Sequence, residues 1–319
     1  MNVVLTGAAG FIGFHTGLAL LKKKNFVYGI DDVNPYYDVS LKRDRLSILR
    51  KYKNFYFIKK KIEDKKIHSF FKKKKIDVII NLAAQAGVRH SLKNPHVYIE
   101  SNVLGQVNML ELARLLNVKK FIYASSSSVY GGNKNMPFSV NQRVDNPISL
   151  YAASKKSTEL VAECYSHLFN MNCIGLRFFT VYGPWGRPDM ATFIFTKNIL
   201  ENKIIEIFNY GKMERDFTYI DDIVQGILGA LKNNKVCGHK IYNLGNSNPE
   251  VLMEFVELIE KTLKLNAKKK LLPIQPGDVS KTYADIEESK KDLNFFPKVK
   301  ISEGIPKFID WYRKYYKLP

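Results

Sequence analysis

The sequence predicts an α/β protein with a doubly wound parallel sheet and a smaller C-terminal domain. Three features predict this: strand-like and helix-like segments alternate through the first half, glycines follow the first strand-like run, and the pattern becomes irregular beyond Gly183-Pro184. Such alternation is typical of parallel sheets with right-handed crossovers. We expect residues 1–178 with 218–246 to form the first domain and 179–217 with 247–319 the second.

Each expected element follows from a local pattern. Apolar residues at spacings of three and four indicate the first helix, at Phe11, Phe14, Leu18 and Leu21. Longer helices are expected at 95–116 and 151–169. Short apolar runs predict strands at residues 2–6, 26–30, 55–58, 77–82, 121–124 and 172–179. The run at 77–82 is almost wholly apolar, as expected for a central parallel strand buried on both faces.

Composition narrows the class of protein. The 319 residues suffice for a large α/β domain plus a smaller one, and the apolar fraction of 45% is that of a packed protein. The sequence has neither a leader pattern nor an apolar run of about 18 residues. We therefore expect a cytoplasmic protein with no membrane partner. The scattered cysteines Cys164, Cys173 and Cys237 predict neither a disulfide nor a zinc site, and no metal is expected.

The net charge of +20 is unusual and has two interpretations. A basic protein can bind nucleic acid through phosphate electrostatics. Here the excess is mostly lysine, in short runs at residues 22–24, 59–61, 72–75 and 268–270. No arginine-rich arm or nucleic-acid-binding motif accompanies these runs, most of which flank the ends of expected elements. The pattern favours a solvated surface, and no nucleic-acid partner is expected.

A glycine-rich turn joins the first strand to the first helix. In Thr6-Gly-Ala-Ala-Gly-Phe-Ile-Gly13, Gly7 permits the tight turn, Gly10 lets the backbone approach a pyrophosphate, and Gly13 lets helix and strand pack closely. Asp31 closes the second strand, where its carboxylate would accept hydrogen bonds from the adenosine ribose and repel a 2′-phosphate. The context predicts a Rossmann domain that binds NAD, with Asp32 as a weaker second candidate.

A catalytic group follows further along the chain. Tyr151 and Lys155 are four residues apart at the start of a helix and so share one face. A phenol is a poor base at neutral pH, and a nearby cation brings its pKa toward the working range. Ser126 belongs to a run of four serines at the end of a strand, where a parallel sheet opens its ligand crevice. Its hydroxyl can bind a reacting hydroxyl or a developing oxyanion.

The glycine turn, the strand-end acid, the serine and the tyrosine–lysine pair (YxxxK) occur in this order along the chain. With these features the chain resembles the extended short-chain dehydrogenase/reductase family from residue 2 nearly to residue 316. The segment Pro276-Gly-Asp278 belongs to this match. Longer strings resemble the UDP-glucuronate 4-epimerases within the family, namely Ala-Gln-Ala-Gly-Val-Arg (84–89), Arg-Phe-Phe-Thr-Val-Tyr-Gly-Pro-Trp-Gly-Arg (177–187) and Asn-Tyr-Gly-Lys (209–212). The candidate cofactor-binding residues are Gly7, Gly10, Phe11, Ile12, Gly13, Asp31, Asp32, Ala83, Tyr151 and Lys155.

The resemblance implies a role for each remaining site residue. Tyr151 would be the base, Lys155 would hold the nicotinamide ribose, and Ser126 would orient the sugar hydroxyl. Arg187 and Arg215 would contact the diphosphate and Asp278 the uridine ribose. Ser127, Ser128 and Thr180 would hold the sugar carboxylate. Arg89 is a further substrate candidate, for which a salt bridge that shapes its loop is an equal alternative.

The resemblance implies 4-epimerisation of UDP-glucuronate through a 4-keto sugar, which as a β-keto acid readily loses CO₂. A carboxylate held by hydroxyl donors would resist that loss through its orientation. Ser127 and Ser128 stand where sugar dehydratases and decarboxylases of the family carry acidic residues, which disfavours dehydration and makes decarboxylation the weaker alternative. A 4-epimerase of neutral UDP-hexose or UDP-N-acetylhexosamine and an NAD-binding regulatory protein are further alternatives.

Two expectations concern neighbours of the site. Lys61 occupies the position at which relatives usually carry an Asp near the adenine amino group, and lysine cannot accept that hydrogen bond. We therefore expect altered adenine contacts. Relatives are often dimers through paired helices, and helices 95–116 and 151–169 would serve in a homodimer interface. Packing of their apolar faces in the core of the protein is the alternative.

Overall fold

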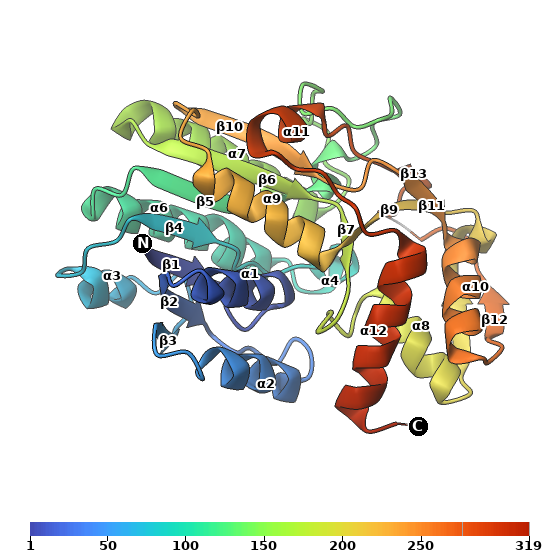
Figure 1. Cartoon of the computed structure of the whole chain (residues 1–319). Helices are drawn as coiled ribbons and strands as arrows, with labels where there is room; N and C mark the ends of the chain where they lie inside the picture. Colours follow the sequence, from blue (N-terminus) through green and yellow to red (C-terminus); the bar gives the residue numbers. More distant parts are fainter. Residues whose placement is uncertain (276, 319) are drawn as a thin grey trace.

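A computed structural model describes residues 1–275 and 277–318; Pro276 and Pro319 lie outside the described residues. Its centre is a seven-stranded parallel sheet (Figure 1) in the order β10-β6-β5-β4-β1-β2-β3. The strands are β1 (Asn2–Thr6), β2 (Phe26–Asp31), β3 (Phe55–Lys59), β4 (Val78–Asn81), β5 (Lys120–Ser126), β6 (Asn172–Phe178) and β10 (His239–Leu244). The predicted doubly wound sheet is confirmed. Strand order reverses between β1 and β4, where such sheets open a ligand crevice.

Helices cover both faces of this sheet (Figure 1). One apolar core joins the sheet to α1 (Phe11–Lys22), α2 (Val39–Leu49), α9 (Ile220–Lys232) and α11 (Glu287–Leu293). A second core lies on the opposite face, under α3 (Lys66–Phe71), α6 (Gly105–Leu115) and α7 (Leu150–Phe169). Strand β4 is buried along its whole length, as its apolar sequence predicts.

The later part of the chain builds a smaller layer beside the carboxyl ends of the strands. Strand β9 (Glu214–Tyr219) pairs with β7 (Thr180–Tyr182), β11 (Pro249–Val251) and β13 (Lys281–Thr282), and β8 (Ile204–Ile207) pairs with β12 (Lys268–Leu271). The helices α8 (Ala191–Leu200), α10 (Leu252–Leu263) and α12 (Ile301–Tyr316) gather here (Figure 1). No helix within 1–275 and 277–318 is long and apolar enough to cross a membrane.

The two parts share one apolar core. Val3 of β1 and Phe14 of α1 belong to the same buried cluster as Phe193 of α8 and Phe308 of α12. Helix α11 lies within the predicted second domain, but it packs against α9 and β10 of the central sheet. The domain boundaries therefore remain a prediction.

The predicted helix at 95–116 is helical almost throughout but is not one regular α-helix. It consists of α5 (His96–Tyr98), a π-helical segment η1 (Ile99–Leu104) and α6. The wider turn follows from Asn102, which is buried and exchanges hydrogen bonds with the backbone of Gln85, at 2.8 Å and 3.0 Å. A bulge of this kind inserts where a side chain must reach a partner outside the helix. The predicted strand at 172–179 ends one residue early, at Phe178.

Candidate active site

The carboxyl ends of the central strands open into a cavity of about 1100 Å³. Its wall includes every residue predicted from the sequence to bind cofactor or substrate or to take part in catalysis. These are Gly7, Gly10, Phe11, Ile12, Gly13, Asp31, Asp32, Ala83, Arg89, Ser126, Ser127, Ser128, Tyr151, Lys155, Thr180, Arg187, Arg215 and Asp278. The structure brings the whole predicted set together, and their individual roles remain predictions.

The turn between β1 and α1 requires its glycines. Gly7 has a φ of +68°, and a Cβ added there would lie 2.9 Å from the amide nitrogen of Ala83. A Cβ on Gly13 would lie 1.9 Å from the carbonyl oxygen of Gly7. Gly10 is the N-cap of α1 and no side chain caps it, so the first turn presents its backbone N–H groups. This arrangement fits a dinucleotide pyrophosphate.

Asp31 holds the same turn from the side of β2. Its carboxylate accepts hydrogen bonds from the backbone N–H groups of Ala9 (3.0 Å) and Val33 (2.8 Å). Burial raises the pKa of Asp31, and the N–H of Val33 and the charge of Lys42 oppose that rise. Asp31 is thus part of the scaffold of the turn as well as a candidate ribose acceptor, and NAD fits this site better than NADP because the carboxylate would repel a 2′-phosphate.

The catalytic candidates come from two neighbouring elements. Ser126 ends β5, and its hydroxyl accepts a hydrogen bond from the N–H of Ser128 at 3.2 Å. Tyr151 and Lys155 lie in the first turns of α7, which Ser149 caps through the N–H of Ala152. Burial raises the pKa of Tyr151, while the Ser126 hydroxyl and the charge of Arg187 lower it. The geometry allows a phenol that exchanges a proton with a ligand in the cavity.

Lys155 is anchored below Tyr151. Its ammonium donates to the carbonyl oxygen of Ala124 at 2.9 Å, and burial lowers its pKa to about 8, against the opposing charge of Glu159. The charge of Arg187 lowers the pKa of the Tyr151 phenol. The role of Lys155 in tuning Tyr151 remains a prediction.

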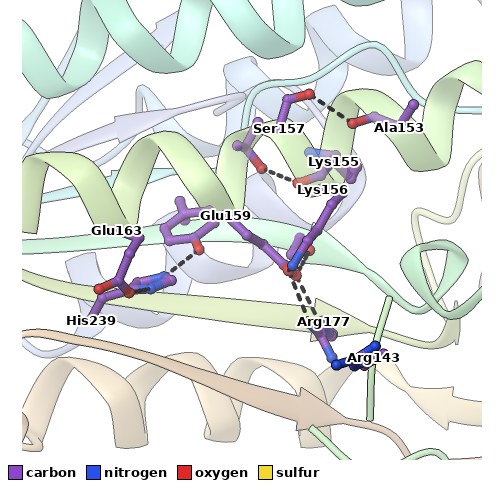
Figure 2. A network of polar contacts seen from close by, with 12 residues as sticks. Arg143, Ala153, Lys155, Lys156, Ser157, Glu159, Glu163, Arg177 and His239 are labelled. Carbon is purple, nitrogen blue, oxygen red and sulfur yellow. Dashed lines mark hydrogen bonds and ion pairs between the residues drawn. The ribbon is translucent and has the colours of Figure 1, made fainter. Parts of the chain in front are cut away.

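A buried polar network lies beneath Lys155 (Figure 2). Glu159, one turn further along α7, accepts two hydrogen bonds from Arg177 of β6, at 2.8 Å and 2.9 Å, and one from Ser125 of β5 at 2.6 Å. Burial would raise the pKa of Glu159, but Arg177 holds it below its ordinary value. Removing one partner of such a pair leaves a buried charge uncompensated, so the pair fixes α7 against the sheet.

Three hydroxyl residues line the same cavity as the glycine turn. Ser127 and Ser128 begin the 3₁₀ helix η2 (Ser127–Tyr130), and Thr180 is the first residue of β7. All three side chains are partly exposed. Hydroxyl groups can donate to a carboxylate, and they carry no charge that would act as an acid or base near neutral pH.

The cationic candidates make different contacts. Arg187 pairs with Asp189, which also accepts a hydrogen bond from Tyr36 at 3.0 Å. Arg215 donates to the carbonyl oxygens of Glu214 (2.9 Å) and Ser280 (3.2 Å), and burial lowers its pKa. A further contact of Arg215 is to the Met213 sulfur at 3.7 Å, and the charge of Asp278 opposes the lowering of its pKa. The hydrogen bonds of the guanidinium at these contacts are thus to uncharged atoms, which suits a site for an anionic ligand.

Arg89 and Asp278 meet across the cavity mouth. Their side chains form an ion pair at 3.1 Å, and the Arg89 guanidinium lies 4.6 Å from the ring centroid of Phe208. Both alternatives for Arg89 thus remain possible, because the ion pair shapes the loop and the side chain also lines the cavity. Lys61 lines the cavity as well and lies 3.7 Å from Glu63.

Sequence reasoning missed several residues at this site. Asn102 donates to the Ser154 hydroxyl at 2.9 Å and so connects η1 to the helix that carries Tyr151. Tyr36 and Asp189 form the hydrogen bond beside Arg187. No sequence signal distinguishes Asn102, because the same helical stretch also carries Ser101, Gln106 and Asn108. Within 1–275 and 277–318 no group of three or more His, Cys, Asp or Glu side chains could hold a metal ion.

Curated relatives cover almost the whole chain. Protein CapI of Staphylococcus aureus is 49% identical over 99% of this chain and 100% of its own length. A probable UDP-glucuronate 4-epimerase of Rhizobium meliloti is 42% identical over 99% of this chain and 98% of its own.

Solved structures and a family match agree with these relatives. The UDP-glucuronic acid 4-epimerase of Bacillus cereus, in complex with UDP-glucuronic acid and NAD, is 35% identical, covers 99% of this chain and 100% of its own, and superposes with a TM-score of 0.94. Residues 3–245 match the NAD dependent epimerase/dehydratase family. Together with the glycine turn, the strand-end acid and the Ser-Tyr-Lys group in one cavity, this match establishes that the chain belongs to the NAD dependent epimerase/dehydratase family.

Proposed function

We propose that this protein is a UDP-glucuronate 4-epimerase that interconverts UDP-glucuronate and UDP-galacturonate and uses bound NAD. One observation carries the proposal: a wall of three hydroxyl side chains, Ser127, Ser128 and Thr180, shares a cavity with Tyr151 and the glycine turn. A relative with this activity is 42% identical over nearly its full length. The hydroxyl wall would favour an acidic sugar over a neutral one, because carboxylate oxygens are strong acceptors.

The chain's own residues would move the proton. Tyr151 takes the proton of the C4 hydroxyl, and Ser126 holds that oxygen through its own hydroxyl. When bound, NAD accepts a hydride from C4 and returns it, so no net oxidation occurs. After the 4-keto sugar turns over in the cavity, Tyr151 returns the proton to the C4 oxygen on the new face. Lys155 would hold the nicotinamide ribose.

The hydroxyl wall would also protect the intermediate from decarboxylation. A β-keto acid loses CO₂ when the breaking bond stands perpendicular to the ketone plane. Hydrogen bonds from Ser127, Ser128 and Thr180 would keep the carboxylate away from that alignment, a positioning effect. The three residues come from η2 and β7, two elements that rest on the buried core, so their spacing is set by the fold.

The diphosphate and uridine would lie further along the cavity. Arg187 and Arg215 would contact the diphosphate, and Asp278 the uridine ribose. The Arg215 contacts support this assignment, because its hydrogen bonds go to the uncharged carbonyl oxygens of Glu214 and Ser280 and to the Met213 sulfur. Asp278 would have to share its carboxylate between Arg89 and the ribose.

We also propose a homodimer through α6, η1 and α7. Leu104, Leu160 and Leu168 are exposed on these elements, with 46%, 55% and 68% of their surface accessible. Large apolar side chains gathered on neighbouring helices indicate a surface that another copy covers. Sedimentation of the protein should give a dimer, and Leu160→Glu together with Leu168→Glu should give a monomer.

The activity is tested by incubating the protein with UDP-glucuronate and following the sugar products by NMR. We expect UDP-galacturonate without net NADH. Release of CO₂ with a pentose nucleotide would overturn the proposed protection by the hydroxyl wall. Turnover of neutral UDP-sugars alone would overturn the assignment of the substrate.

A Tyr151→Phe variant separates an enzyme from an NAD-binding regulatory protein. The variant lacks the proton carrier, so turnover should fall by about a thousandfold or more while NAD and UDP-glucuronate still bind. Calorimetry measures the binding. If the variant and the parent share the same turnover, Tyr151 is not the base.

A further inference from the structure

Arg45 is a buried cation to which the proposed mechanism gives no role. It lies on α2 and is fully buried, with 0% of its surface accessible. Its neighbour Arg43 on the same helix is exposed. Lysine and arginine are almost never fully buried without a partner, so the contacts of Arg45 need an explanation.

The guanidinium of Arg45 joins three separate segments. Nη1 donates to the carbonyl oxygen of Ala9 (2.9 Å) and to the Tyr37 hydroxyl (2.7 Å). Nη2 donates to the carbonyl oxygens of Trp185 (2.6 Å) and Gly186 (3.2 Å). All four acceptors are uncharged. Arg45 therefore connects the glycine turn to the loop that immediately precedes Arg187.

That loop adopts a backbone conformation that needs support. Trp185 has a φ of +61°, in the left-handed region that bulky residues rarely occupy. The two carbonyl groups that Nη2 of Arg45 binds both belong to this bend. The ring of Trp185 packs against Phe14 of α1 and Trp311 of α12, with centroids 5.5 Å and 5.3 Å away. The bend is thus held on its backbone by Arg45 and on its side chain by the aromatic core.

A second contact strengthens the same connection. The ring of His15 on α1 lies with Nε2 2.9 Å from the carbonyl oxygen of Pro184. The glycine turn itself is held from the opposite side, since the N–H of Ala9 donates to Asp31. Both backbone groups of Ala9 are therefore hydrogen-bonded: its N–H to Asp31 and its carbonyl oxygen to Arg45.

We propose that Arg45 is a positioning residue that fixes the Trp185–Gly186 bend to the glycine turn and thereby sets the place of Arg187 in the cavity wall. Arginine suits this role because its planar fork reaches two groups of acceptors at once, which a lysine ammonium cannot do. Only the identity of the anion that Arg187 binds rests on the proposed function.

Hydrogen exchange of the NAD-loaded protein tests the connection without substrate. In Arg45→Met, amides of residues 7–14 and 183–190 should both exchange about tenfold faster or more, because both segments lose a contact that restrains them. Arg43→Met is the matched control on the exposed face of α2 and should exchange like the parent. Changes confined to residues 39–49, or no change, would overturn the proposal.

If Arg45→Met does not fold, the same hydrogen-exchange experiment on Arg45→Lys tests the proposal. The lysine keeps the charge but cannot span both sets of acceptors, so at least one of the two segments should exchange faster than in the parent. If both segments exchange as in the parent, the forked contact is unnecessary and the proposal is wrong.

A double-mutant cycle tests whether Arg45 acts through Arg187. The readout is the affinity for UDP-glucuronate, measured by calorimetry in NAD-loaded protein that also carries Tyr151→Phe so that no turnover occurs. Arg45→Met and Arg187→Met should each weaken binding about tenfold, and the double variant should bind no worse than Arg187→Met. Losses that multiply would overturn the proposal. If the Tyr151→Phe parent does not bind UDP-glucuronate, the proposed function fails, and hydrogen exchange still decides the role of Arg45.

Discussion

The two walls of the cavity are built from different parts of the chain. The cofactor wall (Gly7, Gly10, Gly13, Asp31 and Ala83) is mostly backbone at the ends of adjacent parallel strands. Hydrogen bonds to neighbouring residues hold this backbone in place. The Thr6 hydroxyl accepts a hydrogen bond from the N–H of Ala83 at 2.9 Å and donates one to Asn81 at 2.5 Å.

The substrate wall (Ser127, Ser128, Thr180, Arg187 and Arg215) is made of side chains. They come from η2, β7, the loop after β7 and β9, over almost ninety residues of sequence. Pairs such as Arg187 with Asp189 connect these side chains to residues next to them. We infer that adding a side-chain atom to the cofactor wall disrupts both NAD binding and the fold. Removing a polar atom from the substrate wall changes the reaction but leaves the fold intact.

The largest effect should come from adding one methyl group to the cofactor wall. Gly13→Ala places a Cβ 1.9 Å from the Gly7 carbonyl oxygen, so the turn must move. We expect loss of bound NAD and destabilisation by about 3 kcal/mol or more, measured by absorbance and denaturant unfolding. Gly132→Ala is the control, because the nearest atom to its added Cβ is 3.9 Å away. Equal effects at both positions would contradict the inference.

Lys155→Met should stabilise the protein while it abolishes turnover. Burial lowers the pKa of Lys155 from 10.5 to about 8, so the charged form is costly in the native state. Between those two values the unfolded chain binds more protons, and the stability of the parent rises with pH. The variant should therefore gain up to about 3 kcal/mol below pH 8, and this gain should vanish as pH rises to about 10.5. Denaturant unfolding at pH 7 and pH 10 measures it, and a gain that does not change with pH would contradict it.

Removing hydroxyls from the substrate wall should change the products and leave the fold intact. We expect Ser127→Ala with Thr180→Val to raise the share of CO₂ release about tenfold, because the carboxylate loses two donors. The melting temperature and bound NAD should match the parent. Labelled UDP-glucuronate and NMR quantify both products. An unchanged product ratio would remove the proposed role of the hydroxyl wall.

The smallest effect is expected at the cavity mouth. The ion pair of Arg89 with Asp278 is partly solvated, with 54% of the Arg89 side chain exposed, and such pairs contribute at most about 1 kcal/mol. Arg89→Ala should therefore change stability and KM only slightly if Arg89 shapes the loop alone. A rise in KM of about tenfold would instead identify Arg89 as a substrate contact.

Much of the fold could be predicted because its signals are local. The strands of the central sheet are short apolar runs, and the glycine turn is recognised from a pattern of eight residues, although Ala83 and Asp31 also hold it in the folded protein. Helix α2 was missed because its buried face mixes Lys42 and Arg45 with three leucines, Leu41, Leu46 and Leu49, which interrupts the hydrophobic pattern. The burial of Arg45 depends on the carbonyl groups of Ala9 and Trp185, which are far away in the sequence.

The part of the candidate site that could be predicted consists of residues whose chemistry and spacing are recognisable in the sequence itself. Tyr151, Lys155 and Ser126 stand in patterns with a chemical reason, and all three line the cavity. The π-helical segment was not predictable, because it depends on Asn102 reaching Gln85 across a gap of 17 residues. Asp189 and Tyr36 could not be predicted as site residues either, because their hydrogen bond joins positions 153 residues apart in the sequence.

The strand order has a consequence for synthesis of the protein on the ribosome. Strand β10 forms the edge of the central sheet next to β6, yet β7, β8 and β9 lie between β6 and β10 along the chain. Until residue 244 emerges, a nascent chain exposes the edge of β6, and exposed strand edges favour aggregation. The central sheet therefore cannot finish folding before the ribosome has made β7, β8 and β9 of the smaller layer. Chaperones that hold nascent chains should engage this protein until its final quarter is made.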